Sequence, residues 1–244
     1  MTQVKTVKPY QEEGSKKKQI STMFNNIAPY YDLLNKVLTL GIDRTWRKKA
    51  INLLKEDNPK KLLDIATGTG DLTLEMAKRL QPEEIIGGDI STEMLAIGRE
   101  KVAKAGLTEM ITLKEIDSED MPFESNTFDA ITVAFGVRNF ENLEKGLIEM
   151  HRVLKPKGKL VVLEFSKPTI FPFKQLFNFY FKYILPTIGK FTSKDPKAYK
   201  YLYESVQAFP DGKNFVSKLD KIGFQSTQFI SLSLGICTIY LGKK

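Results

Sequence analysis

The segment that most constrains the fold is 61–70, KLLDIATGTG. Its apolar half, Leu62–Ala66, predicts a short buried strand, its Thr/Gly half predicts a turn, and the helix-compatible segment Asp71–Leu80 follows. A strand, a glycine turn and a helix in this order bring the backbone against a cofactor in an α/β fold. Gly68 and Gly70 lack a Cβ atom where a ligand would contact the main chain. The segment therefore predicts a nucleotide-like ligand at the end of the first strand.

The alternation of strands and helices continues beyond this segment. Apolar runs predict further strands at Glu84–Asp89, Ile111–Ile116, Phe128–Phe135 and Lys159–Phe165. Helices are predicted between the strands, at Asp71–Leu80, 91–106 and Leu143–Leu154. A chain that alternates in this way folds into a mainly parallel sheet with helices on both faces. Such sheets bind their ligands outside the carboxyl ends of the strands.

Polar residues stand at the predicted carboxyl ends of these strands. Asp89 ends the second strand, 19 residues after Gly70, where an acid accepts hydrogen bonds from the hydroxyl pair of a ribose. Asp117 and Ser118 follow the third strand, and 134–139 ends the fourth. We therefore expect these residues to line one crevice together with the glycine turn.

The segment before the first strand differs in composition from the rest. We interpret 1–18 as a disordered basic tail, because it is polar, contains Lys16–Lys18 and shows no periodicity. The rest of the chain, 19–244, is expected to form a single domain. The first part of this domain, 19–58, has helical spacing interrupted by Pro29 and predicts a helical lid over the strand ends.

An insertion rich in aromatic residues, 167–210, interrupts the alternation. Its apolar residues at helical spacing are Phe173, Leu176, Phe177, Tyr180, Phe181 and Ile184. Such a helix can pack on the sheet, roof an apolar pocket or lie at a membrane interface. A helix at Asn214–Ile222 and a hairpin-like pair of strands, Phe224–Leu232 and Gly235–Leu241, are predicted to complete the sheet.

Composition excludes several classes of protein. The single cysteine, Cys237, excludes an internal disulfide and a cysteine-rich metal site, and it fits a reducing compartment. No apolar run of about 18 residues is present, so we expect no membrane span, and the polar N-terminal segment predicts no signal peptide. The net charge of +8 fits nucleic acid or an anionic lipid surface as a partner, or simply a lysine-rich soluble surface. His151 is expected to be structural, and we expect no metal site.

The order of the elements resembles that of the class I S-adenosylmethionine methyltransferases. Those enzymes have a Rossmann-like, seven-stranded sheet with one reversed strand. They bind the cofactor at the acid of the first strand, the glycine turn and the acid of the second strand. Nicotinamide dehydrogenases share this arrangement but carry a third glycine, and Thr73 stands at that position here. The resemblance therefore implies S-adenosylmethionine rather than a dinucleotide.

Several segments, spread over nearly the whole chain, resemble the menaquinone/ubiquinone C-methyltransferase family. They are Phe24–Asn35, Asp64–Leu72, Asp89–Leu95, Phe135–Asn139 and Leu163–Pro168. The resemblance implies methyl transfer to a ring carbon of a polyprenylated quinol, most readily a naphthoquinol, with a benzoquinol as the second choice. It implies a cytoplasmic enzyme without a nucleic-acid partner, and it allows peripheral contact with the inner face of the membrane and a homodimer.

The resemblance also assigns residues to the cofactor. The contacts that it implies are Asp64, Thr67, Gly68, Thr69, Gly70, Asp89, Ile90, Met94, Asp117, Ser118 and Ala134. The family often has a serine where Ala134 stands, so a side-chain hydroxyl contact to the cofactor is absent at this position.

The candidate catalytic residues are Arg138, Asn139, Tyr31 and Asp32. A quinol ring carbon becomes nucleophilic when a ring hydroxyl loses its proton, so a base, or a cation that stabilises the phenolate, assists the reaction. Arginine is a poor base because its pKa lies above about 12. We therefore expect Arg138 to stabilise the phenolate or to relay a proton through water, and the alternative is a salt bridge to a nearby acid. Tyr31 and Asp32, in the lid, are expected either to assist the reaction or to be structural.

Three other functions stay open at this point. The acceptor can be another apolar small molecule, such as a sterol or a polyketide. RNA or DNA as the acceptor fits the charge, but 134–137 reads Ala-Phe-Gly-Val and not the Asn/Asp-Pro-Pro-Tyr motif of nucleic-acid amino-methylating enzymes. A cofactor-binding protein without activity is the third alternative.

Overall fold

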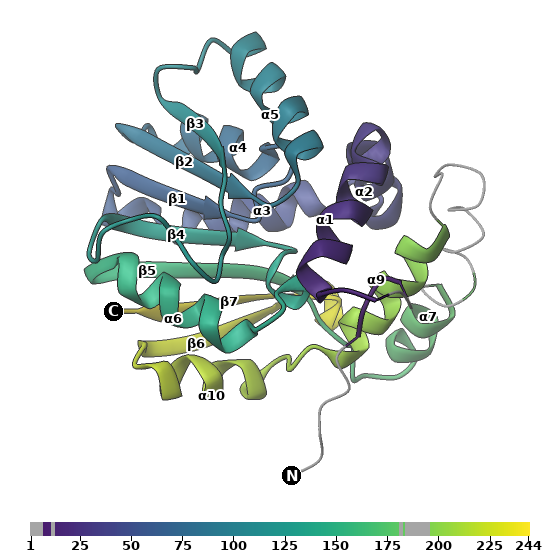
Figure 1. Cartoon of the computed structure of the whole chain (residues 1–244). Coiled ribbons are helices and arrows are strands. Elements are labelled where there is room, and N and C mark those ends of the chain that lie inside the picture. Colours follow the sequence, from purple (N-terminus) through teal and green to yellow (C-terminus); the bar gives the residue numbers. More distant parts are fainter. Residues whose placement is uncertain (1–6, 11–12, 181–182, 184–195) are drawn as a thin grey trace.

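A seven-stranded sheet runs through the centre of the molecule (Figure 1). The computed structural model describes residues 7–10, 13–180, 183 and 196–244. The strands are β1 (Lys61–Ile65), β2 (Glu84–Asp89), β3 (Ile111–Glu115), β4 (Phe128–Ala134), β5 (Leu154–Phe165), β6 (Gln225–Leu232) and β7 (Cys237–Lys243). They lie in the order β3-β2-β1-β4-β5-β7-β6, and β7 runs antiparallel to both of its neighbours. The predicted Rossmann-like, mainly parallel sheet with one reversed strand is confirmed.

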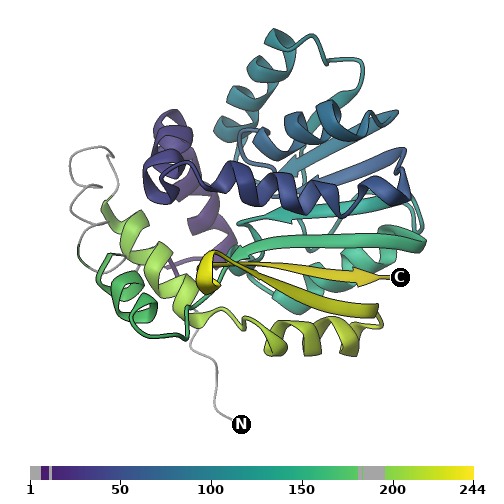
Figure 2. The ribbon, with the colours of Figure 1, turned by 180° about the vertical axis from the view of Figure 1, so that it is seen from behind.

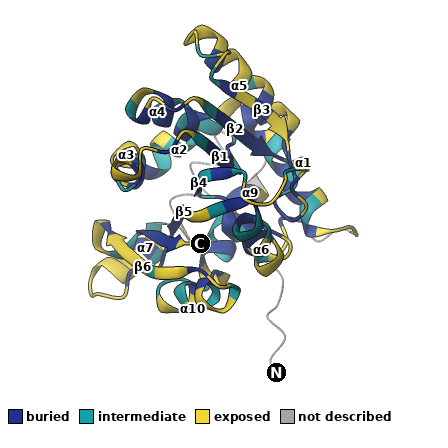
Figure 3. Ribbon diagram, turned by 90° about the vertical axis from the view of Figure 1, so that its left-hand side faces the viewer, coloured by how far each residue is buried: buried dark blue, intermediate teal, exposed yellow. Residues whose placement is uncertain are grey.

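Helices cover both faces of this sheet, as predicted. On one face pack α3 (Asp43–Asn52), α4 (Asp71–Leu80) and α5 (Thr92–Lys104), and α3 crosses the front of the sheet in Figure 2. On the other face pack α6 (Leu143–Val153) and α10 (Lys213–Ile222), which lie in front in Figure 1. Figure 3 shows the central strands largely buried and the outer sides of α5 and α10 exposed. This distribution follows because a covered parallel sheet is apolar on both faces, whereas each helix buries one apolar stripe.

The carboxyl end of β1 is the switch point of the sheet. From β1 the chain winds outward to β2 and β3, and it then returns to β4 on the other side of β1. Ala66 and Phe135, directly after β1 and β4, both have a positive φ, 54° and 58°. Such strain clusters at functional sites and costs on the order of 1–3 kcal/mol per residue. Gly136 is required beside them, because a Cβ atom there would lie 2.4 Å from the Cβ of Ala66.

A helical lid lies at the carboxyl ends of the strands. It consists of α1 (Lys16–Ile27), the 3-10 turn η1 (Ala28–Tyr30) and α2 (Tyr31–Thr39). The predicted break at Pro29 is confirmed, since this residue lies in η1 between the two helices. Apolar side chains of α1 pack against α5 and the later helix α9 (Pro196–Ala208), which holds the lid over the switch point.

The predicted limits of the lid are wrong at both ends. Lys16 does not belong to a solvated tail, because α1 begins there, the Ser15 hydroxyl caps the helix, and the Lys16 side chain is buried. The lysine run lacks apolar periodicity, but the Lys16 ammonium donates to the carbonyl oxygens of Arg138 and Phe140. The lid also ends before α3, which covers the sheet instead. Residues 1–6 and 11–12 of the predicted tail lie outside the described residues.

The aromatic insertion forms α7 (Phe173–Phe179) and α9 at the same end of the molecule as the lid (Figure 1). Phe177 is buried and Tyr180 is half-buried, whereas Leu176 and Phe179 are exposed. The predicted apolar stripe is therefore divided between the core and the surface. Its last members, Phe181 and Ile184, lie outside the part of the chain that the structure describes.

The end of the chain completes the sheet as predicted. β6 and β7 pair antiparallel and are joined by the 3-10 turn η5 (Ser233–Gly235). One boundary differs, because β5 begins at Leu154 and not at Lys159. Leu154 pairs with Phe128 of β4 across a local irregularity in register, so residues 155–158, between the predicted helix and the predicted strand, are part of β5.

Candidate functional site

Two adjoining cavities lie at the switch point, between the strand ends and the lid. Both are lined mainly by apolar side chains together with a few polar ones, as small-ligand sites are. The side chains that line both cavities are Phe24, Tyr31, Phe135 and Asn139. The site therefore has two compartments that meet at a common wall, an arrangement suited to a donor and an acceptor.

Asp89 is the central polar residue of the first cavity. The backbone N–H of Gly68 donates to its Oδ2 at 2.8 Å, and the backbone N–H of Ser91 donates to its Oδ1 at 2.9 Å. Burial raises the pKa of the Asp89 carboxyl to about 6, although these backbone donors act in the opposite direction. The carboxylate lies at the end of β2 and lines the cavity, so it is placed to accept hydrogen bonds from the hydroxyls of a bound ligand.

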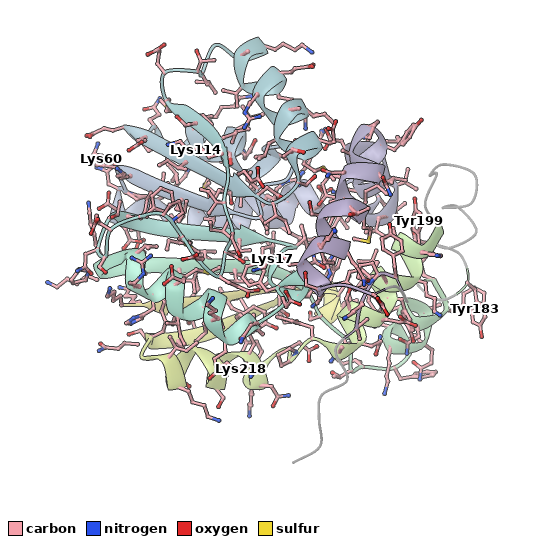
Figure 4. The ribbon with its side chains drawn as sticks, viewed as in Figure 1. Lys17, Lys60, Lys114, Tyr183, Tyr199 and Lys218 are labelled. Atoms are coloured by element: carbon pink, nitrogen blue, oxygen red, sulfur yellow. The ribbon has the colours of Figure 1, made fainter. Side chains whose placement is uncertain are left out.

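Most of the residues predicted to contact the cofactor line this first cavity. They are Gly68, Asp89, Ile90, Met94, Asp117, Ser118 and Ala134. Lys17, which is labelled in Figure 4, also lines this cavity, and its Nζ lies 2.5 Å from Asp117 Oδ2. The sequence predicted a disordered tail at Lys17, because residues 1–18 show no apolar periodicity. The contact between Lys17 and Asp117 was therefore not predicted.

Asp64 lies deeper, behind the glycine turn. The hydroxyls of Thr67, Thr73 and Thr132 donate to its carboxylate at 2.7, 2.7 and 2.6 Å, and burial raises the pKa of the Asp64 carboxyl. These bonds fix the turn to β4 and to α4, and they give Asp64 a structural part in the site. With Thr67, Thr69 and Tyr31, Asp64 lines a third, smaller cavity.

Gly70 lines neither of the two large cavities. It is the residue before α4 and has a φ of 78°, a conformation that glycine adopts readily. In the structure Gly70 forms the turn that leads the chain into α4. Its contact with the cofactor stays a prediction.

Asp32 and Thr69 are hydrogen-bonded to each other, and neither of them lines the first or the second cavity. The Thr69 hydroxyl donates to Asp32 Oδ1 at 2.6 Å, and Lys101 Nζ lies 2.5 Å from Asp32 Oδ2 and 2.9 Å from the Thr69 hydroxyl. Asp32 lines neither large cavity, so the structure gives no support to its predicted catalytic role. Its contacts tie α2 of the lid to the glycine turn and to α5.

The second cavity has apolar walls and a small group of polar residues. Its apolar walls include Met23, Ile27, Leu34, Leu38, Phe165 and Leu202. Its polar residues are Tyr31, Asn35, Arg138, Asn139, Tyr199 and Tyr201. The Tyr201 hydroxyl, on α9, donates to Asn139 Oδ1 at 3.2 Å, so the insertion supplies part of this cavity. Burial raises the pKa of the Tyr31 phenol, and the nearby side chain of Asn35 acts in the opposite direction.

Arg138, in the 3-10 turn η3 (Val137–Asn139), forms an ion pair at the edge of the second cavity. Its NH1 lies 2.6 Å from Oε1 of the fully buried Glu164 and donates to the carbonyl oxygen of Phe135 at 2.5 Å. Among the described residues, its Nε is the one buried side-chain nitrogen or oxygen atom that has no hydrogen-bond partner. Both predicted roles are therefore compatible with the structure, since Arg138 pairs with an acid and also lines the cavity.

Sequence reasoning missed Glu164, Tyr201 and Asn35 as site residues. Glu164 left a signal, because it is a lone acid in an otherwise apolar strand, Leu160–Phe165. Tyr201 and Asn35 left none, since tyrosines are frequent in the insertion and polar residues are frequent in the lid.

Residues set aside as structural are packed accordingly. The His151 ring packs edge-on against Phe224 at a centroid distance of 4.9 Å, and Cys237 is fully buried in β7. Over 7–10, 13–180, 183 and 196–244, no group of three or more His, Cys, Asp or Glu side chains could hold a metal ion.

Comparison with known proteins identifies the family. Residues 12–244 match the model of the ubiE/COQ5 methyltransferase family. The chain belongs to this family. Its ubiE/COQ5 membership makes it an S-adenosylmethionine-dependent methyltransferase, as the sequence resemblance implied.

Relatives in this family are similar over nearly their whole length. A demethylmenaquinone methyltransferase of Bacteroides fragilis is 52% identical over 238 residues, which are 98% of this chain and 97% of the relative. A ubiquinone/menaquinone biosynthesis C-methyltransferase of Geotalea daltonii is 47% identical over 96% of this chain and 98% of the relative.

Solved structures share the fold at low sequence identity. A putative S-adenosyl-L-methionine-dependent methyltransferase of Methanococcus maripaludis aligns with a TM-score of 0.60 at 20% identity, over 96% of this chain and 97% of that one. A putative O-methyltransferase of Nostoc punctiforme aligns with a TM-score of 0.66 at 17% identity, over 91% of this chain and 60% of that one.

Proposed function

We propose that this enzyme transfers a methyl group from S-adenosylmethionine to a ring carbon of a polyprenylated quinol, and that the acceptor is demethylmenaquinol. The observation that carries the proposal is the pair of adjoining cavities with a common wall of Phe24, Tyr31, Phe135 and Asn139. The choice of a naphthoquinol rests on the similarity to the relative from Bacteroides fragilis. A benzoquinol of the ubiquinone type is the second acceptor to test.

The side chains that line the first cavity suit the parts of S-adenosylmethionine. Asp89 would hold the ribose hydroxyls, while Ile90, Met94 and Ile116 offer an apolar slot for the adenine ring. Asp117 and Ser118 lie at the end of this slot, where polar groups would meet the edge of the adenine. The bound cofactor supplies an electrophilic methyl group, so the protein has mainly to align donor and acceptor.

The second cavity supports the acceptor ring and a nucleophilic state of that ring. Its apolar walls suit a naphthalene ring and the start of an isoprenoid chain. The guanidinium of Arg138 stabilises a ring oxygen that loses its proton, and the neutral side chains of Tyr31 and Asn139 orient the ring at the common wall. Ring methylation then also requires loss of the proton from the methylated carbon, and water reached through the cavity accepts it.

The test of this function is direct. Purified enzyme is incubated with S-adenosylmethionine and a chemically reduced demethylmenaquinol that has a short isoprenoid tail, and the product is analysed by mass spectrometry. We expect a quinone heavier by one CH₂ group, with the methyl on the ring. A strain that lacks the gene should accumulate the lighter quinone. Absence of product in vitro together with an unchanged quinone pool in this strain would contradict the proposal.

The variant R138A tests the role of the arginine. We expect a loss of turnover of roughly 10²–10³-fold, as for removal of an oxyanion-stabilising donor. Cofactor affinity should stay near that of the wild type, because Arg138 does not line the first cavity. R152A is a matched control, since Arg152 also pairs with a glutamate, Glu149, on the outer side of α6. Turnover that survives in R138A would exclude this role.

We further propose that the lid end of the molecule rests on the membrane that holds the isoprenoid tail. No helix within the described residues is long and apolar enough to cross a membrane. Large apolar side chains are nevertheless exposed around α2 and α7: Leu33, Leu40, Ile42, Ile170, Phe171, Leu176 and Phe179. Tyr183, which points away from the molecule in Figure 4, lies at the same end, and Tyr180 links this segment to Val37 of α2. The exposed Lys36, Arg44 and Lys174 lie among these residues in sequence and favour anionic lipid.

Vesicle flotation tests this contact. We expect the enzyme to float with vesicles that contain phosphatidylglycerol and to float less with pure phosphatidylcholine. The double variant F171S/L176S should lose most of this binding, whereas I148S, which changes an exposed isoleucine on α6, should not. Flotation of the double variant at the wild-type level would contradict the proposal. A homodimer, and the exclusion of nucleic acid as a partner, stay predictions.

A further inference from the structure

Glu164 is a fully buried carboxylate beside the acceptor cavity. Its Oε1 accepts hydrogen bonds from Arg138 NH1 at 2.6 Å and from the backbone N–H of Phe165 at 2.8 Å. Its Oε2 faces the backbone N–H of Arg138 at 3.4 Å. Glu164 lines neither large cavity, so its contact with any bound acceptor runs through Arg138.

Stability alone is a weak reason for this ion pair. The side chains of Arg138 and Glu164 are 8% and 0% exposed, so both charges are taken out of water. The cost of such desolvation is offset by the attraction between the charges only where the geometry is good, and buried pairs are often no more stabilising than apolar residues of the same size. A functional reason for the pair is therefore worth testing.

The pair fixes the orientation of the guanidinium. Its NH1 is held by Glu164 and by the carbonyl oxygen of Phe135, and its Cζ lies 5.6 Å from the centre of the Phe165 ring. Its Nε is buried without an acceptor. A buried N–H that lacks a partner is costly, so stability alone does not account for this arrangement of Arg138, which also lines the second cavity.

We propose that Glu164 is a positioning residue for the methyl transfer. It holds Arg138 by NH1 so that the guanidinium stays at the edge of the acceptor cavity, where it meets a ring oxygen of the acceptor. Its negative charge also limits how strongly the guanidinium favours the ionised form of that oxygen. The inference rests on the proposed function, and it adds a residue that acts through Arg138 rather than on the acceptor directly.

The other titratable groups around this pair come from every element packed against it. They are Lys16 of α1, Tyr31 of α2, Tyr201 of α9, and Cys237 and Tyr240 of β7. Burial raises the pKa of the three tyrosines and of the cysteine, so these groups stay neutral below pH 8. Burial lowers the pKa of Lys16 to about 8, so Lys16 titrates above the acid limb of the profile. Asp89 affects the binding of the cofactor, and measurement of kcat at saturating cofactor removes this effect. Burial also raises the pKa of the Glu164 carboxyl itself, so a shift of the acid limb is assigned to the acceptor hydroxyl only where the directly measured pKa of a bound naphthol moves with it.

The experiment compares E164Q and E164D with the wild type in the dependence of kcat on pH at saturating cofactor. In E164Q the charge of Arg138 is no longer offset, the acceptor hydroxyl ionises more readily, and the acid limb of the profile should move down by about one pH unit. Its maximal kcat should fall roughly tenfold, because Arg138 is held less firmly. E164D keeps the negative charge, so the acid limb of the pH profile should stay at its wild-type position. The maximal kcat should still fall, because the shorter aspartate side chain holds Arg138 less firmly. The control E149Q, at the Glu149–Arg152 pair, should change neither.

A second readout does not depend on turnover. The naphthol analogue 1-naphthol changes its ultraviolet absorbance when it ionises, and its pKa can be measured while it is bound to each variant. We expect a lower pKa in E164Q than in the wild type and in E164D. If kcat falls in E164Q while the acid limb and the pKa of bound 1-naphthol stay at wild-type values, the pair is only structural and the inference is wrong. If the wild type methylates no quinol, the proposed function fails, and the 1-naphthol titration still decides whether Glu164 controls this cavity.

Discussion

The ammonium of Lys16 donates a hydrogen bond of 3.0 Å to the carbonyl oxygen of Arg138. A second bond, of 2.8 Å, goes to the carbonyl oxygen of Phe140. The first turn of α1 is thereby attached to η3, which carries the arginine of the acceptor cavity. Burial, and next the nearby charge of Arg138, lower the pKa of Lys16 to about 8.

This attachment predicts a dependence of stability on pH. In the unfolded chain a lysine keeps a pKa near 10.5, so between about pH 8 and 10.5 the unfolded state binds the proton more tightly than the folded state. The free energy of unfolding of the wild type should therefore rise, relative to that of K16M, as the pH increases through this window. Denaturant unfolding at pH 7.5, 9 and 10 measures the difference. A constant difference between the two proteins would contradict the buried contact.

Asp89 predicts a second dependence on pH, this time of cofactor binding. Burial raises the pKa of its carboxyl to about 6 in the free enzyme, and hydrogen bonds from ribose hydroxyls would favour the ionised form. Affinity for S-adenosylmethionine should therefore be constant above pH 7 and fall toward a tenfold loss per pH unit well below pH 6, on the order expected for one linked proton. Calorimetric titration between pH 5 and 8 measures this. In D89N the affinity should be low at every pH, and a wild-type slope in D89N would assign the proton to another group.

The contact of Asp32 with Thr69 and Lys101 predicts a role in holding the lid. The Asp32 and Lys101 side chains are 42% and 25% exposed, so this partly solvated pair is worth about 0.2–1 kcal/mol. D32A should therefore increase the rate of amide hydrogen exchange in α2 by only about 1.4- to 5-fold, with a modest rise in KM for the cofactor. K104M, which removes the fully surface pair of Lys104 with Glu100, is the matched control. A loss of kcat in D32A beyond about 100-fold would restore the catalytic role that the structure does not support.

The sheet and the convergence of its strand ends could be predicted from the sequence for a physical reason. Buried parallel strands are continuous apolar runs, and the residues after them meet at one edge, which brought Asp89, Asp117 and Asn139 together correctly. Pairings between distant charges could not be predicted in this way. Glu164 meets Arg138 across 26 residues, and Lys16 meets η3 across more than a hundred, and neither contact leaves a periodic signal. For Asp32 the sequence left a catalytic and a structural role open, because an acid beside two tyrosines suits either, and its catalytic role stays a prediction.

Tyr201 predicts how far the insertion takes part in the reaction. Its hydroxyl, on α9, donates to Asn139 Oδ1 at the common wall of the two cavities. Y201F keeps the ring but removes this donor, which leaves a buried amide oxygen without its partner at a cost of about 1–3 kcal/mol. Without this hydrogen bond the amide of Asn139 is held less firmly in its orientation. We therefore expect kcat/KM for the quinol to fall roughly 5- to 100-fold while cofactor affinity changes little. Y203F, a neighbouring change on the same helix that removes a hydroxyl outside both large cavities, is the control. Equal losses in the two variants would mean that α9 contributes through packing alone.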